Sequence, residues 1–468
     1  MSAKGTVGLL ILTMVLGVLM DNIDASIVNV ALPTIAADFH TDTSSVSWVS
    51  IAYSLMMAGL IIPFGRIADA GRIRIVFITG FSVFTVFSVF CAMSTSLSLL
   101  VVSRIFQGVG AAAIVAVAPM ICVKLLPREH LGRSLGIMAI ASSTGFALGP
   151  ALGGVLVQYL SWHWIFLINI PLGIACILLG RASLPREEVS KGALDVRGSF
   201  LLFVTVAAMV IAVESISDPD ELWIAAIAGI VALLFLAGYI RESTHASRPL
   251  FDLSLFRLRD MDLALIAYLL LNLVYMGVLY VLPFYMDIEL GLSSIMSGFI
   301  LLLPSVLVII MSIPVGNYTD HRGRRSCAIA ASFFTLVYNV MFFLMEPGMG
   351  LLPLVVASLT MGIVWGFSGS ACTGRVVDNI PEGSKAIGSS MMNFMNYMGG
   401  TVGTALFASL LTIGSGSAGV SIENLTQEAF MDGMGFAMLW GGVLLAAIGL
   451  IAAVLVRDRR RRDTPGKG

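Results

Sequence analysis

Runs of apolar residues, each about twenty residues or longer, recur along the whole chain, with short polar segments between them. A helix of that length crosses the hydrocarbon core of a bilayer. The first run lacks a small-residue cleavage site, so we expect it to be retained as a helix. The pattern predicts an all-α membrane protein with fourteen spans, near residues 6–34, 44–67, 73–94, 97–125, 131–159, 161–183, 197–216, 221–240, 262–287, 292–318, 325–346, 350–376, 384–413 and 430–456.

The composition is that of a membrane protein. The 468 residues are 58% hydrophobic and 12% charged, and the mean hydropathy is +0.96. A soluble protein of this size could not cover so much apolar surface, because roughly half of its folded surface would still face water. We therefore expect the lipid bilayer to be a partner of the chain, and no nucleic acid. The five cysteines all fall within predicted spans without metal-like spacing, so no metal is expected.

The basic residues indicate the orientation of the spans. With both termini on one side, as an even number of spans requires, all of the 27 lysines and arginines except Arg104 fall on that side. Short loops rich in Lys and Arg face the cytoplasm. We therefore expect a multi-pass protein of the cell membrane with cytoplasmic termini. The basic tail is interpreted as a stop-transfer anchor, with binding of anionic lipid as the alternative.

Two blocks of six spans resemble each other. Longer segments at 184–196 and 241–261 bracket spans seven and eight, and six spans lie on either side. A similar loop follows the second span of each block, at 65–72 and 316–324. Such duplication is typical of secondary transporters, whose substrate binds between the halves. The predicted domains are an N-terminal six-helix bundle (1–183), linkers with two additional spans (184–261), a C-terminal six-helix bundle (262–456) and a basic tail (457–468).

Two acidic residues fall within the first span. Asp21 and Asp24 are three residues apart and therefore share one face of a helix. Ionisable residues inside a membrane are costly and are candidates for function. Two carboxylates in a medium of low dielectric hold protons more readily than carboxylates in water, which suits a proton carrier. The alternative is that they cap a polar patch or lie at a water-filled entrance.

Arg104 is the only basic residue that lies well inside a predicted span rather than near its cytoplasmic end. Counted from the outer ends of their helices, Arg104 lies roughly 10 Å deep and Asp24 roughly 15 Å deep. These depths allow the two side chains to face each other, as a pair in which the arginine tunes the protonation of the aspartate. A purely structural ion pair is the alternative.

The repeated loops are predicted to be conformational latches on the cytoplasmic side. Each places an aspartate at the end of an even-numbered span and glycine and arginine soon afterwards, which permits a tight turn and contact with a helix N-terminus. A plain solvated turn is the alternative, and the second copy favours it more. The predicted gate residues are Gly65, Asp69, Gly71, Arg72, Asp320 and Arg324.

Small residues recur in span five. Glycines at this spacing let helices approach closely, and a proline removes one backbone hydrogen bond, so the run suits either gating or tight packing. Its members are Gly145, Gly149, Pro150, Gly153 and Gly154. A Met-rich stretch at 391–398 suits varied apolar ligands or simply fills space. The candidate residues of a substrate cavity are Asn29, Gln107, Tyr275, Asn393 and Asn396.

The chain carries no signature of ATP-driven pumping or of catalysis. A phosphate-binding loop of the Gly-x-x-x-x-Gly-Lys-Ser/Thr type does not occur in the sequence. No nucleophile-and-base set appears within the spans. We therefore expect a protein that is not an enzyme and binds neither nucleotide nor cofactor, and whose energy source is an ion gradient.

Several segments together resemble the major facilitator superfamily, and specifically its fourteen-helix drug/proton antiporters. They are IDASIVNVALP (23–33), GRIADAGR (65–72), RIFQGVG (104–110), GFALGPALGG (145–154) and WHWIFLINIP (162–171). The resemblance implies the major-facilitator fold, with two pseudo-symmetric six-helix bundles plus two extra central helices. It also implies residue roles: proton coupling for Asp24 and Arg104, cytoplasmic gating for Asp69 and Arg72, and antiport for Gly149 and Pro150.

The sequence departs from the family's pattern at three places. His163 stands where the family commonly has Arg, and Asn396 lies near Gly399–Gly400 where Arg is frequent. Span thirteen carries no carboxylate, whereas some family members that export divalent cations have an acid there. Divalent cations are therefore not expected as cargo.

These observations predict a monomeric, proton-driven exporter of small amphiphilic substrates, either lipophilic or monocationic, that works by alternating access. The main alternative is the same fold carrying a lipid-like amphiphile or an endogenous metabolite. A non-transporting membrane sensor is a remote alternative, because the sequence has no long extramembrane effector domain.

Overall fold

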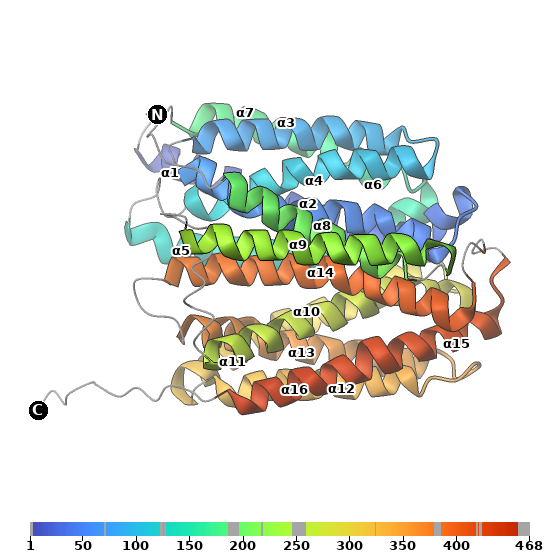
Figure 1. Ribbon diagram of the computed structural model, residues 1–468. Helices are drawn as coiled ribbons and strands as arrows, with labels where there is room; N and C mark the ends of the chain where they lie inside the picture. Colours follow the sequence, from blue (N-terminus) through green and yellow to red (C-terminus); the bar gives the residue numbers. More distant parts are fainter. Residues whose placement is uncertain are drawn as a thin grey trace, which may run out of the picture.

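The protein is a bundle of long helices that run back and forth along one direction, as its computed structural model shows (Figure 1). The structure describes residues 3–69, 72–121, 125, 128–185, 196–216, 219–245, 259–322, 324–378, 385–417, 420 and 424–456. Within these residues, fourteen helices are long and apolar enough to cross a membrane. The fourteen spans predicted from the hydropathy pattern are confirmed, with ends that differ by a few residues.

The N-terminal bundle contains the first six spans. Its helices are α1 (Ala3–Asp38), α2 (Thr43–Asp69), α3 (Ile73–Ala92), α4 (Leu97–Met120), α5 (Arg128–Tyr159), α6 (Trp164–Leu167) and α7 (Asn169–Ser183). The sixth span is broken into α6 and α7 at Ile168. Pro171 explains the break, because it has no N–H to donate to the carbonyl of Leu167 one turn earlier.

The C-terminal bundle repeats the arrangement. Its helices are α10 (Arg259–Phe284), η4 (Tyr285–Glu289), α11 (Ser294–Arg322), α12 (Arg325–Phe343), α13 (Leu351–Asp378), α14 (Lys385–Ser415), α15 (Gln427–Ala437), η7 (Met438–Leu444) and α16 (Leu445–Leu455). The last three form one span, in which η7 is a wider π-helical turn. A Cβ on Gly442 of this turn would lie 2.9 Å from Cγ of Asn339, so only glycine lets α12 approach this closely.

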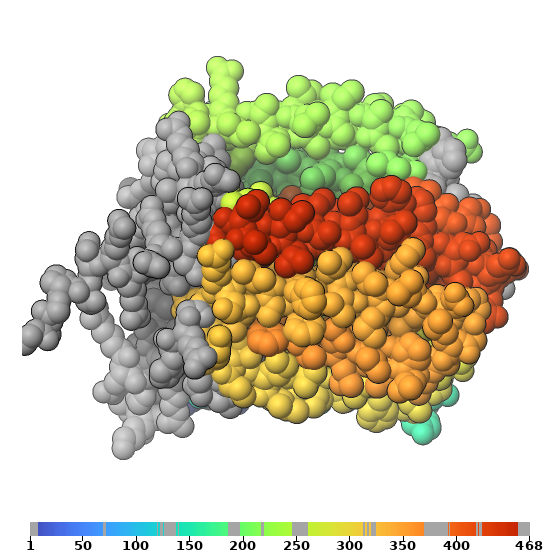
Figure 2. Space-filling model, turned by 90° about the horizontal axis from the view of Figure 1, so that it is seen from below, coloured from blue at the N-terminus to red at the C-terminus, as the bar shows by residue number. Residues whose placement is uncertain are grey.

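The two additional spans differ in their packing. Helix α8 (Val196–Glu214) packs against α2 and α14, and so touches both bundles. Helix α9 (Leu222–His245), joined to it by the short η2 (Pro219–Glu221), packs mainly against α8. Figure 2 shows α9 (light green) at the margin of the molecule, beyond α8. Only α9 is therefore peripheral, and α8 connects the bundles.

Contacts between the two bundles are described toward one end of the molecule. We call the end at which α1 begins and α16 ends the basic end, because Arg72, Arg241 and Arg325 lie there (Figure 1). Contacts between the bundles occur toward the opposite end. A Cβ on Gly154 would lie 3.0 Å from Cα of Ile295, and the hydroxyl of Tyr280 donates to the carbonyl of Thr43.

Candidate functional site

A buried ion pair occupies the interior of the N-terminal bundle. Nη1 of Arg104 on α4 lies 2.7 Å from Oδ2 of Asp24 on α1, and the two side chains are 1% and 0% exposed. The arginine also donates from Nε to the carbonyl of Val49 at 3.0 Å and from Nη1 to Oε1 of Gln107 at 2.7 Å. The pair that the depths of the two residues predict is thus present.

The second oxygen of Asp24 is also fully engaged. Oδ1 accepts hydrogen bonds from Nδ2 of Asn169 at 2.6 Å and from Nε2 of Gln107 at 3.2 Å. The same nitrogen of Gln107 donates to Oγ of Ser88 at 2.8 Å. A buried charge with this many donors is compensated both by its counter-ion and by hydrogen bonds. The arrangement holds the carboxylate of Asp24 in a fixed position.

The glycines after Arg104 explain how α4 reaches its neighbours. A Cβ on Gly108 would lie 2.7 Å from the carbonyl oxygen of Tyr53 on α2, and one on Gly110 would lie 2.6 Å from the backbone nitrogen of Phe84 on α3. Both distances are too short for any residue with a side chain. Arg104 and Gln107, three residues apart, share one face of α4 and meet at the ion pair.

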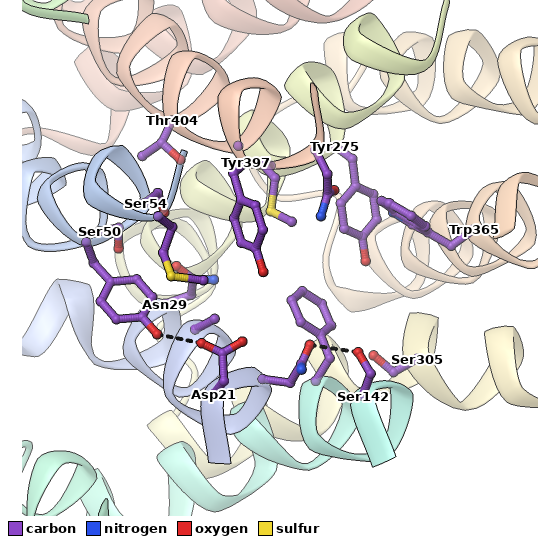
Figure 3. A pocket seen from close by; sticks show the side chains of 18 of the residues that line it. Asp21, Asn29, Ser50, Ser54, Ser142, Tyr275, Ser305, Trp365, Tyr397 and Thr404 are labelled. Carbon is purple, nitrogen blue, oxygen red and sulfur yellow. Dashed lines mark hydrogen bonds between the residues drawn. The ribbon is translucent and has the colours of Figure 1, made fainter. Parts of the chain in front are cut away.

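Asp21 lies one helical turn before Asp24 and has a different environment. It lines a cavity between the two bundles, and the hydroxyl of Tyr53 donates to its Oδ1 at 2.9 Å (Figure 3). The ring of Tyr53 in turn lies against Arg104, whose guanidinium carbon is 4.0 Å from the ring centroid. One tyrosine therefore contacts both the cavity-facing carboxylate and the buried arginine.

The cavity has a volume of about 290 Å³ and two unlike walls. Among the described residues that line it, Asp21 is the only charged one. The N-terminal wall adds mainly small hydroxyl and amide side chains: Asn22, Asn29, Ser50, Ser54, Ser142 and Ser143. The C-terminal wall adds most of the aromatic rings, Tyr268, Tyr275, Trp365 and Tyr397, together with the polar side chains of Ser305, Asn396 and Thr404. Figure 3 shows Asp21 and Tyr397 projecting from opposite walls.

The small residues of α5 form a seam with two neighbours. A Cβ on Gly145 would lie 2.7 Å from the carbonyl oxygen of Leu19, and one on Gly149 would lie 3.0 Å from the nitrogen of Ile27, so α5 packs directly on α1. The carbonyl of Pro150 contacts Gly298 of α11 in the other bundle. The same segment thus holds α1 in place and contributes to the contact between bundles.

The other predicted cavity residues are divided. Asn29, Tyr275 and Asn396 line the cavity, whereas Gln107 belongs to the hydrogen-bond network of Asp24. The side chain of Asn393 lies outside the described residues.

The predicted gate is described only in part. Gly71 and the side chains of Asp69 and Asp320 lie outside the described residues, as does the basic tail 457–468. Arg72 precedes α3 and Arg324 precedes α12, both at the basic end, and Gly65 lies near the end of α2. Gating by these residues stays a prediction.

His163, the departure at the start of span six, is a stacked aromatic residue. Its ring centroid lies 3.7 Å from that of Trp162, which itself donates to Asp38 at 3.0 Å. Burial lowers the pKa of His163 from its ordinary value, partly opposed by the charge of Asp38. The residue is therefore neutral at pH 7 and does not supply the positive charge of an arginine.

Sequence reasoning missed Tyr53, Asn169 and Ser88 as members of the site. Asn169 falls in the segment WHWIFLINIP, so its place in a motif was an available signal. Tyr53 and Ser88 carry no such signal, because single tyrosines and serines are ordinary in membrane helices. Within the described residues, no group of three or more His, Cys, Asp or Glu could hold a metal ion.

Comparison with known proteins decides the family. The sequence profile of the Major Facilitator Superfamily matches residues 14–404. The chain belongs to this superfamily. The riboflavin transporter RibZ of Clostridioides difficile (strain 630) is 30% identical over 398 residues, which cover 84% of this chain and 86% of RibZ. The putative multidrug resistance protein MdtD of Escherichia coli O7:K1 is 32% identical over 423 residues, covering 89% and 88%.

Solved structures agree on the fold. A bacterial homolog of the human lysosomal transporter Spinster, in an inward-facing and unoccupied conformation, superposes with a TM-score of 0.67 at 14% sequence identity. The match covers 99% of this chain and 100% of that one. The protein is therefore a multi-pass membrane transporter with the major-facilitator fold: two six-helix bundles and two extra helices.

Proposed function

We propose that this member of the superfamily is a proton-coupled exporter of lipophilic or monocationic compounds, acting as a monomer without a cofactor. The observation that carries the proposal is the cavity between the bundles, in which Asp21 is the only charged residue among the described lining residues. A single carboxylate among aromatic rings suits a cation with an apolar body. The multidrug name of the relative MdtD supports the same cargo.

Coupling arises from competition at Asp21. A proton and a cationic substrate cannot both neutralise one carboxylate, so protons that enter from outside displace the substrate from the outward-open cavity. Deprotonation toward the cytoplasm then restores affinity. The Arg104–Asp24 pair supplies the fixed electrostatic background for this exchange. The two bundles rock about the cavity between inward-open and outward-open states.

Efflux of ethidium from proteoliposomes under an imposed pH gradient tests the proposal. Asp24→Asn and Asp21→Asn are each expected to abolish gradient-driven efflux, while both variants still insert into the membrane. Ser82→Ala on α3, which is not among the residues that line the cavity and whose hydroxyl donates to the carbonyl of Ile78 in its own helix, is the control and is expected to retain coupling. Undiminished coupled efflux in both aspartate variants would rule the assignment out.

An endogenous metabolite is the second candidate cargo. Two observations favour it: the hydroxyl and amide groups along the N-terminal wall and the similarity to RibZ, a riboflavin transporter. Substrate-dependent proton flux in liposomes, measured with a panel of dyes, lipids, amino acids and riboflavin, separates the candidates. A signal confined to riboflavin or amino acids would favour the metabolite.

We also propose that the protein lies in the cell membrane with both termini in the cytoplasm. The basic residues at one end of the molecule support this orientation. Cysteines introduced in the loop 39–42 should react with impermeant maleimide added outside intact cells, and a cysteine at Ser2 should not. The reverse labelling pattern would contradict the orientation.

A further inference from the structure

Tyr53 touches both charged parts of the site, Asp21 and the Arg104–Asp24 pair. Its hydroxyl donates to Asp21, and the face of its ring is covered by the guanidinium of Arg104. The side chain is 3% exposed. Its backbone is fixed as well, because Gly108 of α4 packs directly on it: a Cβ there would lie 3.1 Å from Cα of Tyr53.

The hydrogen bonds of Arg104 all point away from Asp21. Within the described part of the chain, the guanidinium donates to Asp24, to Gln107 and to the carbonyl of Val49, and makes no bond to Asp21. This division matters because an arginine that pairs directly with a carboxylate favours its ionised form. A proton carrier needs a carboxylate without such a permanent partner.

The groups around Asp21 are few. The titratable and charged residues that face it are Asp24 on its own helix, Tyr53 of α2, Arg104 of α4 and Tyr397 of α14. Helix α5 faces the cavity beside it with neutral side chains such as Ser142. Tyr53 is therefore the direct hydrogen-bond partner through which the rest of the site acts on Asp21.

We propose that Tyr53 is a positioning residue that keeps Asp21 exchangeable. Its ring holds Arg104 on Asp24, and its hydroxyl provides a bond to the ionised carboxylate that weakens when Asp21 takes up a proton or a cationic substrate. This inference rests on the proposed proton-coupled transport and deepens it. It assigns the exchange of protons to Asp21 and the permanent charge to Asp24.

Infrared titration of the full-length protein in lipid nanodiscs tests this inference without any substrate. The band of a protonated carboxyl group is followed from about pH 5 to about pH 9 and is assigned by its loss in Asp21→Asn. In Tyr53→Phe the ring remains but the bond to the ionised form is lost. The titration midpoint is then expected to move up by about one pH unit.

Tyr53→Leu is expected to act in the opposite direction. Without the ring, Arg104 can reach Asp21, so the protonated band is expected to disappear from the accessible range. Tyr275→Phe removes a hydroxyl from the other wall of the same cavity and is expected to leave the midpoint in place. A merely structural tyrosine would not produce shifts of opposite sign.

Two sets of outcomes are distinguishable. An unmoved midpoint in Tyr53→Phe, shifts of the same sign in Tyr53→Phe and Tyr53→Leu, or a band that survives Asp21→Asn would each overturn the role of Tyr53. Midpoint shifts of opposite sign in Tyr53→Phe and Tyr53→Leu would uphold the role of Tyr53. If ethidium efflux were at the same time independent of the pH gradient, the proposed transport function would be refuted.

Discussion

Two aspartates one helical turn apart have environments that differ in kind. Asp24 is sealed inside the N-terminal bundle with an arginine and two amide donors, whereas Asp21 faces the cavity with one tyrosine hydroxyl. The difference follows from the rotation of each residue about the axis of α1. Of the two like charges, that of Asp24 is compensated by Arg104, and that of Asp21 is accessible from the cavity.

The geometry of Arg104 makes a specific demand on its side chain. Arg104→Lys keeps the charge but cannot reach Asp24, Gln107 and Val49 together, because an ammonium is a single point. We expect the variant to lose about 2 kcal/mol of stability, seen as a lower unfolding temperature in detergent. Arg74→Lys is the control, since Arg74 donates only to backbone carbonyls near the surface. Equal losses in both variants would contradict this account.

The neutral state of His163 leads to a prediction about pH. Burial lowers its pKa below the ordinary value of 6.5, so the neutral form predominates at and above pH 7. His163→Gln should therefore leave the pH profile of transport between about pH 7 and about pH 8 unchanged. Efflux assayed across this range checks the prediction, and a displaced profile would show that the histidine takes part in coupling.

Counting residues along helices predicts the Arg104–Asp24 pair but not the rest of the site. The count gives the depth of each residue in the membrane, and similar depths bring the two charges together. It does not give the rotation of one helix relative to the next, which decides that Asp21 and not Asp24 faces the cavity. Tyr53 was missed for the same reason, since its role depends on which face of α2 meets α4.

At the scale of elements, the seam between α1 and α5 sets the position of both aspartates. Gly149→Ala would place a Cβ against Ser26 and 3.0 Å from the nitrogen of Ile27, so the helices must separate. We expect a loss of about 1–3 kcal/mol in unfolding stability, with a fall in efflux. Gly229→Ala on α9 is the matched control, because nothing lies within 4 Å of its Cβ position. Equal unfolding stability of Gly149→Ala and Gly229→Ala would argue against close packing of α5 on α1.

Helix α8 is joined to both bundles at its last turn. The carboxylate of Glu214 accepts hydrogen bonds from Ser44 and Ser47 of α2, and Oγ of Ser409 on α14 donates to the carbonyl of Val213 at 2.9 Å. Glu214 is 6% exposed. Its place at the end of a predicted span was visible in the sequence, but its partners were not.

Loss of the hydrogen bonds between Glu214 and α2 should weaken the contact between the bundles at the end of the molecule opposite the basic end. Glu214→Ala removes the carboxylate that accepts from Ser44 and Ser47, and we expect the bundles to separate there more often. Cysteines introduced at that end should then react faster with maleimide, by about tenfold for a loss of about 1.4 kcal/mol. Glu221→Ala, an exposed acid on the short η2 that precedes α9, is the control. Unchanged reactivity would mean that α8 does not help to close this end.

At the scale of the whole molecule, hydropathy and the repeated loop predict fourteen spans in two six-helix blocks, and the family resemblance implies the major-facilitator fold. A bilayer leaves helices as the way for an apolar chain to satisfy its backbone, so apolar runs translate directly into spans. The breaks within spans were not predicted. The interruption at Ile168 and the wide turns η4 and η7 depend on local prolines and glycines and on packing partners far along the chain.

The unlike walls of the cavity have a consequence for any molecule that fills it. Its positive end would rest on a wall carried by one bundle, and its flat face would rest on rings carried by the other. A motion that separates the bundles moves these two sets of contacts apart. A bound molecule would then lose the contacts of one wall, and this loss would add to the competition with protons at Asp21.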